Sequence, residues 1–155
     1  VDGREPAFEI DLGGGMTSDH RYSPDGRWIA YVSDVSGLEQ VYIVRYPEPS
    51  GIAQLSAEGG TSPLWSPAGD ELFFISGTAV MAVDVRVQGG ELRTGKPRRL
   101  FEGPFHVDPR QIWSYDARNQ RFLMIQRSDE EMWNDRFVVV TDWIDDLERL
   151  LSAEE

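Results

Sequence analysis

Short runs of hydrophobic residues alternate with polar turns along this chain, and the same arrangement recurs. Four-residue apolar runs begin at Ile29, Leu72 and Phe122, and a short polar stretch precedes each of them. Apolar runs of this length, bounded by turn residues and rich in β-branched and aromatic side chains, are typical of buried β-strands. The pattern therefore predicts an all-β chain made of repeated strand pairs.

A tight turn lies directly before each apolar run. The three turn segments read YSPDG (22–26), WSPAG (65–69) and YDARN (115–119). Proline fixes φ at the first corner of such a turn, aspartate or asparagine bonds its own backbone, and glycine tolerates positive φ. Each unit therefore begins with a β-hairpin, although Ala68 replaces the turn aspartate in the second unit and the third turn lacks both proline and glycine. We assign Asp25 to turn structure and not to a metal site.

Further strand patterns complete each unit. Third strands are predicted at 40–46, 79–87 and 136–143, and fourth strands at 52–56 and 98–102. Four short antiparallel strands in a unit of this length are typical of a β-propeller blade. We expect one partial propeller domain over 1–155, with blades at approximately 16–56, 60–103 and 104–141.

The two ends of the chain complement each other. The third unit has no fourth strand, because its last strand runs into a predicted α-helix at approximately 142–152 with Trp143, Leu147, Leu150 and Leu151 on one face. At the other end, residues 8–12 form a fourth-strand pattern without a blade of its own. Two copies that exchange this strand would close a ring of about six blades. The alternative is that the three units belong to a propeller of six or more blades.

Several motifs carry a resemblance to a known family. The Ser-Pro-Asp-Gly hairpin, the segment GGTSPLW (59–65) and the segment GKPRRLFEGPF (95–105) resemble the WD-like repeats of TolB-type β-propellers. The run RFVVVTDWIDDLERL (136–150) is similar to the end of propellers attached to bacterial serine/threonine kinases. The resemblance implies an interaction or ligand-sensing module in the periplasm or another extracytoplasmic space. No kinase motif occurs in this chain, so the resemblance implies no kinase activity.

Composition and charge narrow the function. The 155 residues carry a formal net charge of -12, and the 15 basic residues form no run, so we expect no nucleic-acid partner. The longest apolar runs have the length of a strand, which argues against direct membrane insertion. The absence of cysteine excludes disulfides, thiolate metal sites and a cysteine nucleophile.

We also predict no catalytic residue and no cofactor. The Gly-x-Ser-x-Gly motif of a nucleophile elbow is absent, and His20 and His106 are the only histidines. The leading hypothesis is a non-enzymatic module that binds a protein or peptide partner, as a homodimer or with the rest of a propeller. The alternative is an accessory propeller that gates a serine hydrolase or peptidase whose catalytic domain lies on another segment.

Candidate binding residues lie in the segments that lead into the innermost strands of the first and third units. Both segments are longer than the equivalent segment of the second unit, and in a propeller they would surround one mouth of the channel. The candidates for ligand or partner binding are Asp19, His20, Arg21, His106, Asp108, Arg110 and Gln111. Two other interpretations remain open: solvated loops without a ligand, and a metal site formed by the two histidine-carboxylate pairs.

Overall fold

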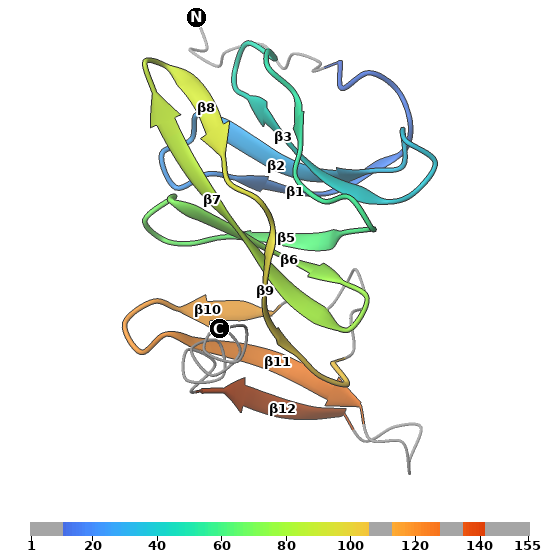
Figure 1. Cartoon of the computed structure of the whole chain (residues 1–155), viewed down its shortest axis with the longest axis vertical. Helices are drawn as coiled ribbons and strands as arrows, with labels where there is room; N and C mark the ends of the chain where they lie inside the picture. Colours follow the sequence, from blue (N-terminus) through green and yellow to red (C-terminus); the bar gives the residue numbers. More distant parts are fainter. Residues whose placement is uncertain (1–10, 106–112, 128–134, 142–155) are drawn as a thin grey trace, which may run out of the picture.

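The chain folds into three antiparallel sheets, which follow one another from top to bottom in Figure 1. The computed structural model describes residues 11–105, 113–127 and 135–141. All regular elements in these ranges are strands, so the predicted all-β class with antiparallel, blade-like sheets is confirmed. The predicted helix at 142–152 lies outside the described residues. Of the predicted strand 8–12, only Asp11 and Leu12 are described, and neither lies in a sheet.

The first sheet has four strands in sequential order. They are β1 (Thr17–Tyr22), β2 (Trp28–Ser33), β3 (Gln40–Arg45) and β4 (Ala53–Gln54). The register pairs Trp28 with Arg45 and Ser33 with Gln40. Every residue of β2 is buried, whereas β1 at the inner edge is largely exposed. The two middle strands, β2 and β3, are therefore the packed part of the sheet, and the edge strands β1 and β4 are more exposed.

The second sheet contains one strand that the sequence pattern did not predict. Its strands are β5 (Thr61–Trp65), β6 (Glu71–Ser76), β7 (Ala79–Gln88), β8 (Glu91–Thr94) and β9 (Arg98–Glu102). The long strand β7 has two partners in succession: its first half pairs with β9, and its second half pairs with β8. The blade's fourth strand is therefore β9, and the β7–β8 hairpin is an extension of the blade.

The third sheet has three strands in the described residues. They are β10 (Ser114–Asp116), β11 (Arg121–Arg127) and β12 (Asp135–Val140). Strand β12 pairs with β11 along its whole length, from Arg127 opposite Asp135 to Phe122 opposite Val140. No strand within the described ranges pairs with the other edge of β12. The edge where a fourth strand would pair is therefore open in this part of the chain.

The first two turns share a hydrogen-bond pattern, and all three keep a carboxylate that accepts hydrogen bonds. Ser23 Oγ donates to Asp25 Oδ1 at 2.7 Å and accepts from Trp28 N at 3.0 Å. In the second unit, Ser66 Oγ donates to Asp70 Oδ1 at 2.8 Å, so Asp70 supplies the carboxylate that Ala68 lacks. In the third unit, Asp116 itself accepts from Arg118 N at 3.0 Å. Each turn therefore retains a carboxylate that accepts hydrogen bonds and fixes the start of the following strand.

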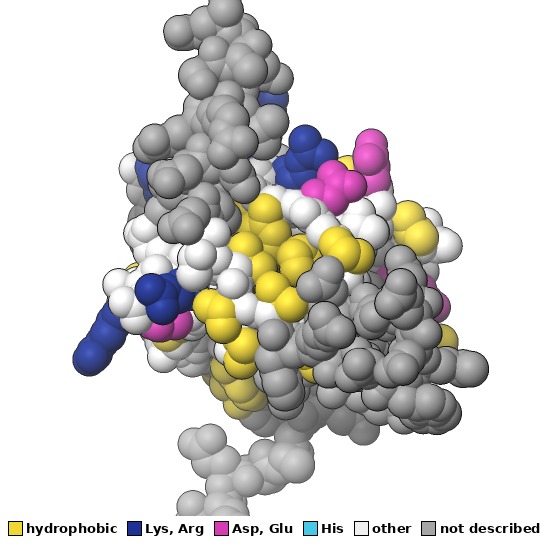
Figure 2. Space-filling view, turned by 90° about the horizontal axis from the view of Figure 1, so that it is seen from below, with side chains coloured by type: hydrophobic (Ala, Val, Ile, Leu, Met, Phe, Trp, Pro, Cys, Tyr) yellow, Lys and Arg dark blue, Asp and Glu magenta, His cyan; other side chains and the backbone are white. Residues whose placement is uncertain are grey.

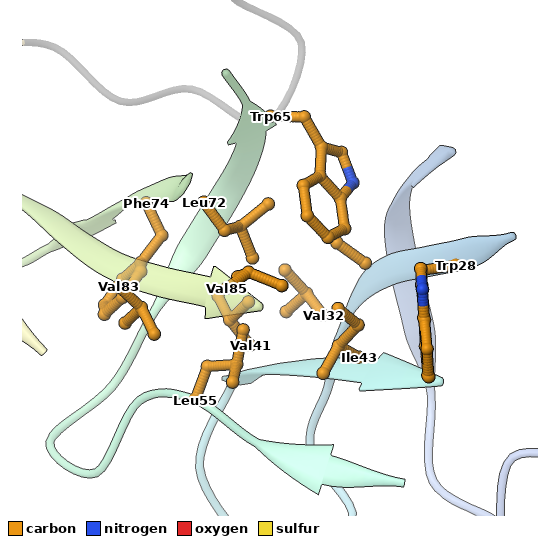
Figure 3. Close-up of a cluster of buried hydrophobic side chains, with 11 residues drawn as sticks. Trp28, Val32, Val41, Ile43, Leu55, Trp65, Leu72, Phe74, Val83 and Val85 are labelled. Carbon is orange, nitrogen blue, oxygen red and sulfur yellow. The ribbon is translucent and has the colours of Figure 1, made fainter. Parts of the chain in front are cut away.

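Side chains on alternate positions of the middle sheet pack in opposite directions, as the period of a strand requires. Leu72 and Phe74 join a cluster with residues of the first sheet, among them Trp28, Val32, Val41 and Ile43, as Figure 3 shows. Phe73 joins a second cluster with Trp113, Phe122 and Met124 of the third unit. These two clusters fill the junctions between neighbouring sheets, and a third, formed by Ile29, Tyr31, Tyr42 and Val44, lies within the first sheet.

Two tryptophans also link neighbouring units through hydrogen bonds. Trp65 Nε1 donates to the carbonyl oxygen of Arg21 at 3.2 Å, and Trp113 Nε1 donates to the carbonyl oxygen of Ser62 at 3.0 Å. Each bond joins a unit to the inner strand of the unit before it. The bonds thus link neighbouring units along the edge that each sheet begins with.

Candidate functional site

The inner strand β1 carries the candidate residues that the structure describes. Its pairing with β2 shifts between Ser18 and Arg21, and Asp19 has a φ of 51°. This geometry is that of a β-bulge, which turns a side chain away from its regular direction. Ser62, at the equivalent place in β5, has a φ of 54° and lies beside a similar shift. The first two units therefore share a bulge in the first strand of the sheet.

Asp19 lies within this junction. Its Oδ2 atom accepts a hydrogen bond from the backbone N–H of Ser62 at 3.3 Å, and the side chain is half-buried. The bond joins the bulge of the first unit to the bulge of the second. Asp19 therefore has a structural partner, which leaves only part of its carboxylate for a ligand.

His20 and Arg21 extend from the same strand into solvent. The His20 ring stacks against Tyr31 with centroids 6.4 Å apart, and its Nε2 atom lies 3.2 Å from Thr17 Oγ1. Burial, with a smaller contribution from Tyr42, raises the pKa of Tyr31 to about 12. Because Tyr31 stays neutral at physiological pH, it gives His20 an uncharged platform. Both candidate side chains remain exposed.

Arg21 is held at its backbone, while its side chain makes a local contact only. Its Nη1 atom donates to the carbonyl oxygen of His20 at 3.0 Å, and its own carbonyl oxygen accepts the bond from Trp65. Within the described ranges, Arg21 has no ion pair. We call the surface formed by Asp19, His20 and Arg21 the rim.

The other candidates, His106, Asp108, Arg110 and Gln111, lie outside the described residues. That they join the rim around one mouth of a channel stays a prediction. The part of the chain that the structure describes contains no group of three or more histidine, aspartate or glutamate side chains that could hold a metal ion. No helix in the same part is long and apolar enough to span a membrane.

A cleft that the sequence did not predict lies beside Trp28, the first residue of β2. It has a volume of about 420 Å³ and separates the β7–β8 hairpin from the connection between β3 and β4. Its lining residues are Trp28, Arg45, Ser50, Gly51, Ala53, Gly90, Glu91, Leu92 and Thr94. The sequence feature that could have predicted the β7–β8 hairpin is the pair Gly89-Gly90. Their φ values of 63° and 84° suit a two-residue hairpin loop. That pair predicts a hairpin, although not which unit the hairpin contacts.

Comparisons with curated proteins give two partial matches, and no family model matches the chain. The chain is 36% identical over 97 residues to the uncharacterized protein Atu1656 of Agrobacterium fabrum. This match covers 58% of this chain and 33% of that protein. The chain is 26% identical over 121 residues to dipeptidyl aminopeptidase BIII of Pseudoxanthomonas mexicana, with coverages of 76% and 17%. The chain thus spans a third or less of the length of these relatives.

Solved structures of the same fold cover more of the chain. TolB from Acinetobacter baumannii matches 84% of this chain and 31% of its own length, with a TM-score of 0.56 and 18% identity. A putative TolB from Agrobacterium tumefaciens matches 79% of this chain and 44% of its own length, with a TM-score of 0.52 and 15% identity. The sheets described above are therefore blades of a TolB-like β-propeller fold.

Proposed function

We propose that this chain, whose sheets form TolB-like β-propeller blades, is a non-enzymatic module that binds a protein or peptide partner. The observation that most supports this function is the rim on β1. Its backbone is fixed by the Asp19 and Trp65 hydrogen bonds, while the side chains of His20 and Arg21 are exposed. A rigid strand that presents adaptable polar groups is suited to recognition, because little backbone entropy is lost on binding.

Replacing His20, Arg21, His106 and Arg110 together with alanine should weaken binding of a peptide selected from a random library on this chain by about tenfold or more. The circular dichroism spectrum should stay of the β type, because His20 and Arg21 are exposed. Affinity is measured by isothermal titration calorimetry. The matched control replaces the exposed Arg86 and Arg118 with alanine and should bind as the unchanged chain does. Unchanged affinity of the fourfold variant would contradict the rim proposal.

We further propose that two copies of the chain close one ring by exchanging residues 8–12. No strand of the described residues pairs with the outer edge of β12, and an edge without a partner promotes pairing with another chain. The third sheet also exposes Leu123 and Val139. Figure 2, a view from the side of the third sheet, shows apolar side chains gathered on this face. Association with further blades of a longer propeller is the competing arrangement.

Sedimentation equilibrium should give twice the 17.6 kDa of one chain at micromolar concentration. Deletion of residues 1–12 should return the chain to a monomer, because the exchanged strand is then absent. Deletion of residues 1–6 is the control and should leave the dimer intact. A monodisperse monomer of the unchanged chain would refute the ring.

The likeness to dipeptidyl aminopeptidase BIII supports a second candidate function. In it, the chain is part of an accessory propeller that controls access to a serine hydrolase or peptidase domain. The open reading frame of the parent gene distinguishes the candidates. An α/β-hydrolase domain downstream supports the accessory role, and a kinase with a membrane span upstream supports a sensing module in the extracytoplasmic location that the family resemblance implies.

A further inference from the structure

The cleft beside Trp28 combines an apolar wall with polar groups that lack partners. The side chains of Trp28, Ala53 and Leu92 line it, and all three belong to or pack against the first hydrophobic cluster. Figure 1 shows the β7–β8 hairpin extending from the second sheet alongside the first. The cleft therefore lies between two units, in a size range that is typical of small-molecule sites.

Trp28 differs from the two tryptophans that link neighbouring units. It is only 6% exposed, and among the described residues its Nε1 atom is the one buried side-chain nitrogen or oxygen without a hydrogen-bond partner. Leaving a buried donor unpaired is unfavourable, and such a group calls for an explanation. Because this atom is itself buried, a ligand in the cleft contacts the Trp28 ring and not its N–H group.

The polar lining of the cleft favours an anion. The exposed Arg45 makes no ion pair with any described residue, and the hydroxyl-bearing residues Ser50 and Thr94 line the same cleft. Glu91 is the only carboxylate in the lining, and its Oε2 atom is paired with Arg93 Nη2 at 3.3 Å. A guanidinium group forms paired, charge-assisted hydrogen bonds with a carboxylate.

A second cavity that shares Trp28 has the opposite character. It has a volume of about 250 Å³ and lies between the Ser-Pro turns of the first two units, with Asp25 and Ala68 in its lining. The hydrogen bond from Ser23 lowers the pKa of Asp25 and so favours the ionised carboxylate. Asp25 is paired with Arg27 Nη2 at 2.7 Å, and the lining of this cavity contains no cationic side chain, which leaves the Arg45 side of Trp28 for an anion.

We propose that the cleft between Trp28, Arg45 and Thr94 binds an organic carboxylate with an apolar body. The carboxylate bonds to Arg45, and the body packs against the Trp28 and Leu92 side chains. The same chemistry is present in a free organic acid and in the C-terminal residue of a peptide. The site is separate from the rim and does not depend on the proposed partner binding.

Titration with N-acetyl-L-phenylalanine, followed by the tryptophan indole N–H signals in nitrogen-15 NMR spectra, tests the proposal. The indole N–H signal that is absent from the spectrum of Trp28→Phe is the signal of Trp28. We expect this signal to shift on addition of the acid and to saturate. The amide of the same compound lacks the charge, and its affinity should be lower by about tenfold or more. Equal binding of acid and amide, or no saturable shift, would overturn the proposal.

Two variants test on which side of Trp28 the ligand binds. Arg45→Gln, an exposed change that leaves the core intact, should weaken binding of the acid by about tenfold or more. Ala68→Leu, which narrows the second cavity, should leave the affinity unchanged. If Trp28→Phe does not fold, Arg45→Gln still decides, since unchanged binding in that variant excludes the Arg45 contact. A larger loss of affinity for the acid in Ala68→Leu than in Arg45→Gln would also contradict the assignment of the ligand to the Arg45 side.

Two further ligands identify the source of the carboxylate. Phenylacetate represents a free acid, and acetyl-Gly-Gly-Phe represents a peptide C-terminus. Saturable binding of both supports a site for organic acids in general, and binding of the peptide alone supports recognition of a C-terminus. Binding of neither, under conditions where the chain is folded, refutes the proposal.

Discussion

Replacement of Phe122 with alanine is expected to lower the free energy of unfolding by about 3–5 kcal/mol. Phe122 is fully buried where the second and third sheets meet. Its ring centroid lies 5.1 Å from that of Phe73 and 4.7 Å from that of Tyr115. Removal of the ring leaves a cavity that the surrounding strands cannot close. Urea unfolding followed by tryptophan fluorescence measures the change.

The neighbouring residue provides the control for this prediction. Leu123 is 39% exposed and lies on the opposite face of β11. Leu123→Ala should therefore cost less than about 1 kcal/mol. Because a slip of one residue exchanges the two faces of a strand, the pair of variants also tests the register of β11. A larger loss in Leu123→Ala than in Phe122→Ala would show that the register is wrong.

Replacement of Gly60 with alanine is expected to cost about 2–3 kcal/mol, although the added group is a single methyl. A Cβ atom at Gly60 would lie 2.6 Å from Ser56 Oγ and 2.8 Å from Ser56 Cβ. Ser56 cannot move freely, because its Oγ atom donates to Gln40 Oε1 at 2.5 Å and accepts from Val41 N at 2.8 Å. The methyl group would therefore disturb buried hydrogen bonds as well as packing.

A second glycine separates this clash from the general effect of adding a methyl group. At Gly95, the nearest atom to an added Cβ would be Asp84 Cβ at 3.3 Å, on an exposed side chain. Gly95→Ala should change the free energy of unfolding by less than about 1 kcal/mol. Both variants are measured by urea unfolding at the same pH. Equal losses would mean that the Ser56 and Gln40 hydrogen bonds do not limit the space at Gly60.

The strands and turns were predictable because their signals are local. Proline and glycine at fixed places define the first two hairpins, and the runs that begin at Ile29 and Leu72 are strands β2 and β6. The compensation for Ala68 was not predicted, since Asp70 lies outside the turn motif but reaches Ser66 in the folded chain. Local sequence therefore identifies the turn, whereas the source of its carboxylate depends on side-chain direction.

The candidate sites were harder to predict because they depend on contacts between units. Asp19 was selected as a binding residue, but the bulge directs its carboxylate to the backbone of Ser62. Arg45 and Thr94 are far apart in sequence and share a cleft only because the β7–β8 hairpin reaches the first sheet. Neither relation has a signature in the residue pattern of a single unit.

Strand β7 pairs with β9 in one half and with β8 in the other, so the β7–β8 hairpin is separate from the four strands of the blade. Because β9 completes the sheet, the hairpin that contains β8 can change in length without breaking the hydrogen bonds between the blade's other strands. The tip residues from Gln88 to Glu91 lie outside the central pairing, so insertions there leave the framework intact. In the course of evolution, propellers of this type could gain, reshape or lose an inter-blade cleft through a single insertion or deletion.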